Sequence, residues 1–136
     1  MIKRLAHICI GAADLERSER FYVDLLGMEV AFAFMRGGER IGFYLRAGST
    51  TFIEVFAERE RRMDDAAGLK HFCLEVEDID ALIEKLNAQG VAVSEKKLGA
   101  DKAWQAWTTD PSGLRIELMQ YTKSSAQFTG EAVLLN

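Results

Sequence analysis

Two histidines and two glutamates are the residues of this sequence whose types and placement could bind a metal ion. The chain has only two histidines, His7 and His71, and each lies in a short, mostly apolar segment. Glu54 and Glu117 also lie inside apolar segments, where a carboxylate is costly unless it is paired, protonated or bound to metal. Two imidazoles and two carboxylates form an N2O2 set suited to Zn²⁺, Ni²⁺, Co²⁺, Mn²⁺ or Fe²⁺. In an octahedron this set leaves two positions for water or substrate.

Each of these residues also has a structural interpretation. A single strand histidine is more often a core or surface residue than a ligand, and Arg115 offers Glu117 an ion-pair partner. Cys9 and Cys73 follow the histidines by two residues, so each shares a strand face with its histidine. They could be outer ligands or small buried hydrophobic residues, and two cysteines do not form a disulfide framework.

An internal repeat relates the four candidate ligands. Residues 5–9, around His7, resemble residues 69–73, around His71, and the same offset carries Asp14-Leu15 onto Asp78-Ile79. Later, residues 52–56, around Glu54, match residues 115–119, around Glu117, with one residue fewer between the landmarks. Two strand motifs and one helix motif that stay in step indicate a duplicated module.

Each module predicts one helix and four strands. In module 1, about residues 3–57, we expect a helix from the N-cap Asp14 to Gly27 and strands at 3–10, 29–34, 41–46 and 51–56. In module 2, about residues 69–121, we expect a helix from Ile79 to Gly90 and strands at 69–76, near 91–96, at 103–109 and at 114–121. Residues 110–113, Asp-Pro-Ser-Gly, predict a turn. The fold class is therefore α+β, with two tandem βαβββ modules forming a single domain over residues 1–121.

Composition limits the classes of function. A net charge of −4 with 28% charged residues of mixed sign offers no basic face for nucleic acid. Apolar runs are too short to span a bilayer, and Met1–Gly11 reads as a strand, so we expect a soluble, cytoplasmic protein. The charged segment Glu58–Ala67 predicts a solvated linker, and residues 122–136 form a tail that could pack on a partner or lie disordered.

These features resemble the vicinal oxygen chelate superfamily over about Leu5 to Tyr121. The resemblance is carried by His7, the stretch from Asp14 to Gly27 with Phe21-Tyr22 and Leu25-Leu26-Gly27, and the turn at 110–113 that leads into Ile116-Glu117-Leu118. It implies a glyoxalase-like fold, in which curved mixed sheets wrap a metal site, commonly in a homodimer.

The ligand set most resembles that of bacterial glyoxalase I, at all four positions. This resemblance implies a metal-dependent lyase or isomerase that acts on a small α-hydroxycarbonyl or hemithioacetal through an enediolate, in the manner of a lactoylglutathione lyase. It also implies Glu117 as the base, with Glu54 as its counterpart, and a homodimer with shared sites. Methylmalonyl-CoA epimerase usually has Gln at the position of Glu54, and an extradiol dioxygenase, a less favoured alternative, uses one carboxylate fewer.

Two positions depart from glyoxalase I. Its usual Arg four residues after the first ligand is Gly11 here, and its frequent Asn four residues after the second is Glu58. Both changes remove groups associated with glutathione, so we expect the substrate to be a different small molecule.

A rival hypothesis is a binding or resistance protein that sequesters a small apolar or aromatic molecule. Bleomycin-binding members of the superfamily usually lack a metal set, which favours the enzyme. The residues that could line a pocket are Tyr44, Phe56, Trp104, Trp107, Arg115 and Met119.

Overall fold

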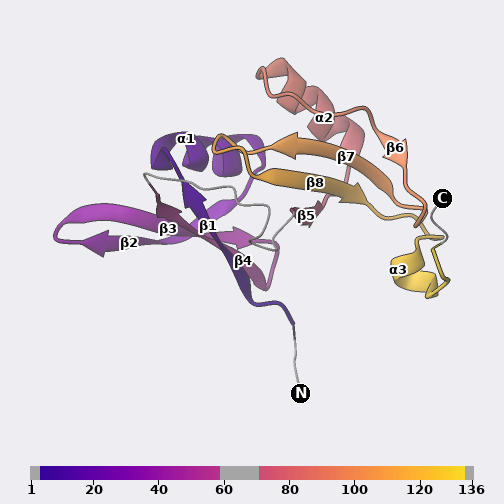
Figure 1. The fold of residues 1–136 in the computed structure, drawn as a ribbon, viewed down its shortest axis with the longest axis horizontal. Coiled ribbons are helices and arrows are strands. Elements are labelled where there is room, and N and C mark those ends of the chain that lie inside the picture. Colours follow the sequence, from indigo (N-terminus) through magenta and orange to yellow (C-terminus); the bar gives the residue numbers. More distant parts are fainter. Residues whose placement is uncertain (1–3, 59–70, 134–136) are drawn as a thin grey trace. The chain divides into compact units, whose positions relative to one another are not determined.

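The chain forms two compact units, residues 1–64 and residues 65–136, each built around one four-stranded mixed sheet (Figure 1). The structure is a computed structural model that describes residues 4–58 and 71–133. Each unit follows the order strand, helix, then three strands, which confirms the predicted α+β class with two βαβββ modules. The predicted linker lies, apart from Glu58, outside the described residues. No helix in the described parts is long and apolar enough to span a bilayer.

In the first unit the strands lie in the order β1-β4-β3-β2, and only the pair β1 and β4 is parallel. The elements are β1 (His7–Ala12), α1 (Leu15–Glu19), the π-helical segment η1 (Arg20–Leu25), β2 (Glu29–Arg36), β3 (Glu39–Ala47) and β4 (Thr51–Ala57). The first strand therefore begins at His7 and extends beyond the predicted 3–10.

The first helix begins and ends where its sequence predicts. The Asp14 side chain accepts a hydrogen bond from the Arg17 amide at 3.0 Å, as an N-cap does. After Leu26 the chain turns through Gly27, whose φ of 73° suits glycine. Phe21 and Tyr22 are buried, and they anchor the helical segment in the core of the unit.

One face of the first sheet forms that core. Alternate residues of β1, β3 and β4 are buried on this face: Ile10, Ala12, Phe43, Leu45, Ile53 and Val55. Because strand side chains alternate, His7, Cys9 and Glu54 lie on the opposite face. The helix side of the sheet thus supplies stability, and the other side is left for the candidate site.

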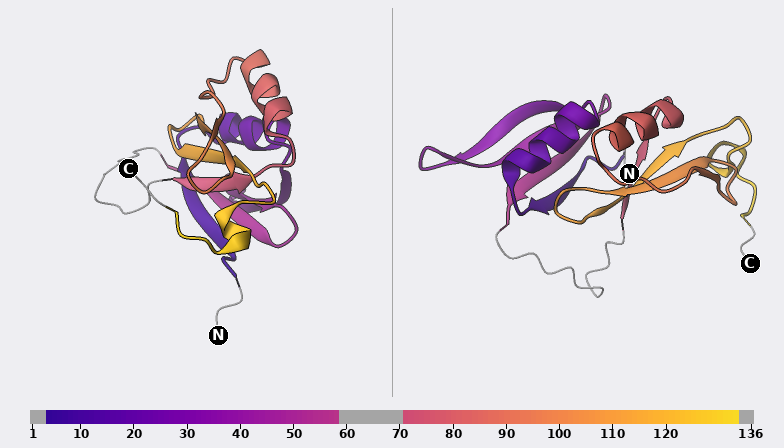
Figure 2. Two further views of the ribbon diagram at one scale, coloured as in Figure 1. Left: turned by 90° about the vertical axis from the view of Figure 1, so that its right-hand side faces the viewer. Right: turned by 90° about the horizontal axis from the view of Figure 1, so that it is seen from above.

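The second unit repeats this plan, with strands in the order β5-β8-β7-β6 and a parallel pair β5 and β8. Its elements are β5 (Phe72–Glu75), α2 (Ile79–Ala88), β6 (Lys97–Leu98), β7 (Trp104–Thr109) and β8 (Arg115–Gln120). Asp78 caps α2 by accepting from the Ala81 amide, and α2 packs against β7 and β8 (Figure 2).

The strand predicted near residues 91–96 is wrong. The only strand between α2 and β7 is the short β6, at residues 97–98. Ser94 explains the difference: its amide donates to the Trp107 carbonyl, but its hydroxyl, not its backbone, accepts from the Trp107 amide. A side chain that takes one bond of the ladder stops the segment from pairing as a strand.

The turn between β7 and β8 is confirmed. The buried Asp110 carboxylate accepts hydrogen bonds from the amides of Ser112 and Leu114, at 2.9 and 2.8 Å. Gly113, with φ 84°, completes the turn.

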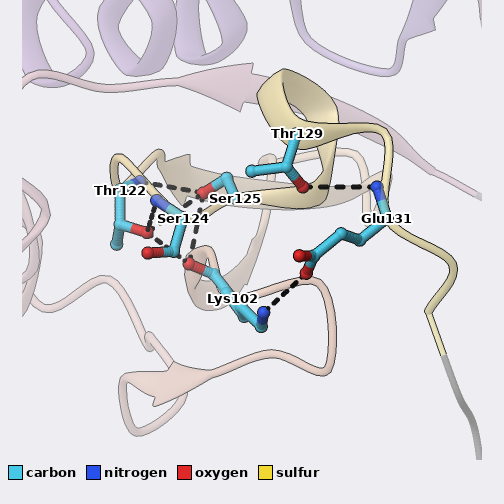
Figure 3. A network of polar contacts seen from close by, with 6 residues as sticks. All are labelled: Lys102, Thr122, Ser124, Ser125, Thr129 and Glu131. Atoms are coloured by element: carbon cyan, nitrogen blue, oxygen red, sulfur yellow. Dashed lines mark hydrogen bonds and ion pairs between the residues drawn. The ribbon is translucent and has the colours of Figure 1, made fainter.

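The tail contacts its own unit up to Glu131. It contains the short helix α3 (Ala126–Thr129) and is tied to the loop before β7 (Figure 3). The Lys102 carbonyl accepts from the hydroxyls of Thr122 and Ser125, and the Lys102 ammonium pairs with Glu131 at 2.8 Å. Residues 122–131 of the tail are therefore ordered against their own unit.

Candidate metal-binding residues

Each unit brings together one histidine and one glutamate. In the first unit His7 Nε2 lies 3.5 Å from Glu54 Oε2, and in the second unit His71 Nε2 lies 3.2 Å from Glu117 Oε2. Both glutamates are largely covered, with side chains 23% and 9% exposed, whereas the histidines are more open. Within residues 4–58 and 71–133, no three His, Cys, Asp or Glu side chains gather closely enough to hold a metal ion.

The two pairs occupy equivalent places in their sheets. In the first sheet the row across the strands runs Cys9, Glu54, Tyr44, and in the second it runs Cys73, Glu117, Trp107. The aromatic ring of each row meets its histidine edge-on, with ring centroids 5.8 Å apart for Tyr44 and 4.8 Å apart for Trp107. The parallel pairing of the first and last strand thus places the same candidate half-site, one histidine beside one glutamate, in each unit.

The spacing of each pair suits two neighbouring ligands of one ion. Nitrogen and oxygen ligands lie about 2.0–2.2 Å from a metal such as zinc, so two of them lie about 2.8–3.1 Å apart at a right angle and about 3.3–3.6 Å apart at the tetrahedral angle. The distances of 3.2 and 3.5 Å lie within the span of these values. They are longer than the ordinary N–H···O hydrogen bond of about 2.9–3.0 Å.

Cys9 and Cys73 lie beside the two glutamates, and both residues are exposed, so the alternative that they are small buried hydrophobic residues is wrong. Partial burial, followed by the charges of Glu117 and Asp101, raises the pKa of the Cys73 thiol to about 12. Partial burial and the Glu54 carboxylate also raise the pKa of Cys9. In each unit a hydrogen bond from the thiol to the neighbouring glutamate also contributes to the raised pKa.

The predicted pocket residues divide between the two faces of the sheets. Phe56 lies on the face of Glu54, and Arg115 and Met119 lie on the face of Glu117. Trp104 lies on the other face, where it pairs with Gln120 and Leu98 and carries the Lys96 ammonium over its ring at 4.7 Å.

A cavity of about 280 Å³ beside Trp107 adds residues that the sequence interpretation missed. Gln105 shares the face of Trp107, and strict alternation in β7 was the signal that could have found it. Lys97 follows the segment that was incorrectly predicted as a strand, residues 91–96, so the sequence interpretation did not assign it to the pocket. The lining residues are Ser94, Glu95, Lys97, Gln105 and Trp107.

Comparison with known proteins decides the family. Residues 4–118 match the model of the Glyoxalase/Bleomycin resistance protein/Dioxygenase superfamily. The chain belongs to this superfamily. The predicted resemblance is therefore confirmed over nearly the whole chain, and the two βαβββ units are the fold of this superfamily as its solved members have it.

Relatives within the superfamily carry more than one kind of name. A probable lactoylglutathione lyase from Synechocystis is 30% identical and covers 85% of this chain and 94% of its own length. The mitochondrial methylmalonyl-CoA epimerase of Bos taurus is 27% identical and covers 86% of this chain and 74% of its own. Among solved structures, a glyoxalase family protein from Enterococcus faecalis is 29% identical, covers 86% of this chain and 97% of its own, and has a TM-score of 0.73.

Proposed function

We propose that this chain is a metal-dependent lyase or isomerase that acts on a small α-hydroxycarbonyl compound or hemithioacetal. The observation that carries the proposal is the equivalent His–Glu pair in each unit, spaced as two neighbouring ligands of one ion would be. The relatives named as a lactoylglutathione lyase and an epimerase support it, since both names describe rearrangement beside a carbonyl group.

His7, Glu54, His71 and Glu117 would hold the ion together. Each unit offers one imidazole and one carboxylate, too few for tight binding of a divalent ion, so the proposal requires both pairs. The pairs would come from one chain or from two chains of a homodimer.

Glu117 is the proposed base. When bound, the ion would act as a Lewis acid that favours negative charge on a carbonyl oxygen of the substrate. The Glu117 carboxylate would accept the proton from the carbon beside that carbonyl and return it to the neighbouring carbon. Glu54 is its counterpart in the first unit.

Glutathione conjugates are not the proposed substrates. A Cβ added at Gly11 would overlap the carboxylate of Glu58, so that carboxylate fills the space into which an arginine side chain would project. Its charge also contributes to the raised pKa of Cys9, which places the charge beside the first pair. A negative charge there would repel the carboxylates of glutathione.

Proton exchange tests the proposal directly. Chain stripped of metal would be reloaded with Zn²⁺, Ni²⁺, Co²⁺, Mn²⁺ or Fe²⁺ and incubated in D₂O with a panel of α-hydroxycarbonyl compounds. We expect NMR to show metal-dependent deuterium uptake at the carbon beside the carbonyl, abolished by Glu117→Gln. Glu75→Gln is the matched control, because Glu75 shares the face of Glu117 but lies opposite Met119. Absence of exchange with every metal and compound would reject the enzymatic proposal.

A pure binding function is the second candidate, and the aromatic face of the first sheet favours it. Tyr44 stacks on Phe32 and Phe52 with centroids 4.6 and 5.1 Å apart, and Phe34 lies 4.6 Å from Phe56. Such rings suit a flat apolar ligand. Tight binding of an aromatic compound without any proton exchange would decide for this function.

A further inference from the structure

Arg115 does not make the ion pair that its position suggests. It precedes Glu117 by two residues on the same face of β8, yet the described residues include no carboxylate within 4.0 Å of its guanidinium. The guanidinium lies instead over the Trp107 ring, 4.0 Å from its centroid. Among the described residues Glu117 therefore pairs with His71, and Arg115 has an aromatic ring and no carboxylate as its partner.

The position over Trp107 is compatible with a second contact of Arg115. A guanidinium that lies over an aromatic ring keeps N–H donors that match the paired oxygens of a carboxylate or phosphate. Trp107 also meets His71 edge-on and lines the 280 Å³ cavity. The donors of Arg115 thus lie at the border of the second half-site.

Arg46 shows that the arrangement is not general in this chain. It also lies over an aromatic ring, Phe52, at 5.6 Å, but it has a carboxylate partner in Glu29 at 3.9 Å. Arg46 therefore combines an aromatic contact with a carboxylate partner, and it serves as a control for Arg115.

We propose that Arg115 is a specificity residue that binds an oxyanion, a carboxylate or a phosphate, carried by the substrate. The inference rests on the proposed function, since it concerns the end of the substrate that does not react. Glu75 and Glu117 both place carboxylates on this face of the second sheet, and Arg115 places a guanidinium on the same face. A cation among carboxylates is a position at which an anionic group of a substrate is attracted and not repelled.

Binding of matched chelators tests this. The probes are succinic acid monohydroxamate, its analogue with a neutral carboxamide in place of the carboxylate, and its phosphonate analogue. With zinc-loaded protein we expect calorimetry to show about tenfold or tighter binding of one or both anionic probes over the amide, as bonds to a charged group provide. We expect Arg115→Gln to abolish this preference, Arg115→Lys to keep part of it, and Arg46→Gln to leave it unchanged.

A second readout does not depend on turnover. In a Trp104→Phe background the remaining indole is Trp107, so an anionic probe that engages Arg115 should shift its fluorescence. Equal affinities of the three probes in the wild-type chain, or a preference that survives in Arg115→Gln, would overturn the role of Arg115 alone. Failure of all three probes to bind the loaded chain would overturn the proposed metal site and this inference with it. Preference for the carboxylate or the phosphonate tells which oxyanion the residue accepts.

Discussion

At the scale of single residues, the same residue type acquires different properties from its surroundings. Glu54 and Glu117 occupy equivalent register positions, but the second is covered more completely, at 9% against 23% exposure of the side chain. Arg46 and Arg115 both lie over aromatic rings, but only Arg46 has a carboxylate partner among the described residues. Residue type alone therefore indicates a class of chemistry, and the contacts of each side chain in the fold determine what that side chain can do.

Loss of one imidazole should remove tight metal binding. We expect about one divalent ion per chain in the wild type, and at least about a hundredfold weaker affinity in His71→Ala. The reason is that removal of mere outer-shell partners of a ligand already costs about 10–100-fold. Calorimetric titration with Zn²⁺ measures the change, with Glu75→Gln as control. The idea fails if elemental analysis finds no metal in the wild type and Zn²⁺, Ni²⁺ and Co²⁺ cause no thermal shift.

Gly11 and Glu58 should act as a coupled pair in substrate choice. We expect the wild type to turn over the methylglyoxal–glutathione hemithioacetal with kcat/KM below about 10⁴ M⁻¹s⁻¹, the lower end of the usual enzyme range. Gly11→Arg alone should not help, because the new side chain meets the Glu58 carboxylate.

The double variant Gly11→Arg/Glu58→Asn removes both the overlap and the charge, and we expect it to raise kcat/KM at least about tenfold. Steady-state kinetics of the wild type, Gly11→Arg and the double variant gives the comparison. A wild type that already turns over this substrate within the usual range would show that these two positions do not exclude glutathione.

At the scale of elements, register and turns carry the candidate ligands to their places. The parallel pairing of β1 with β4 and of β5 with β8 puts each glutamate next to the strand that the histidine begins or precedes. His71 lies just before β5, so the start of that strand places His71 beside Glu117. The turn at Asp110 sets the start of β8 and with it the position of Glu117.

Replacement of Asp110 should destabilise the second unit. Asp110→Ala removes the acceptor of two backbone amides, those of Ser112 and Leu114, in a buried turn. We expect the free energy of unfolding to fall by about 1–3 kcal/mol. Asp110→Asn retains an acceptor oxygen and should lose less. Urea unfolding followed by tryptophan fluorescence measures both, and an unchanged Asp110→Ala would show that the turn forms without these bonds.

At the scale of the whole molecule, duplication supplies two equivalent His–Glu pairs, and the proposed site of four ligands would combine them. Sequence resemblance to bacterial glyoxalase I favours a homodimer in which His7 and Glu54 of one chain join His71 and Glu117 of the other. Two-fold symmetry would then produce two such sites per dimer.

Mixed dimers test where the site is assembled. His7→Ala and His71→Ala homodimers should each lack a complete site, but refolding the two variants together should give a mixed dimer with one intact site and one without either histidine. Random pairing makes about half of the dimers mixed, so about a quarter of wild-type tight metal binding should return. No recovery in verified mixed dimers would exclude the shared site.

The sequence by itself determined the duplicated α+β fold, its helix caps and its final turn, because these depend on local rules. Asp14, Asp78, Gly27 and the turn at 110–113 act through neighbouring backbone groups, and the repeat related the histidines and glutamates before any contact was known.

Only the tertiary structure decided the contacts that connect distant segments. The strand expected near 91–96 was lost because the Ser94 hydroxyl bonds to Trp107, a partner that no local pattern reveals. Likewise Arg115 could reach Glu117 or Trp107 from its place in β8, and packing between β8 and β7 places its guanidinium over the Trp107 ring. The Glu58 carboxylate fills the space beside Gly11 for the same reason: β1 and β4 meet side by side although their residues lie far apart in the chain.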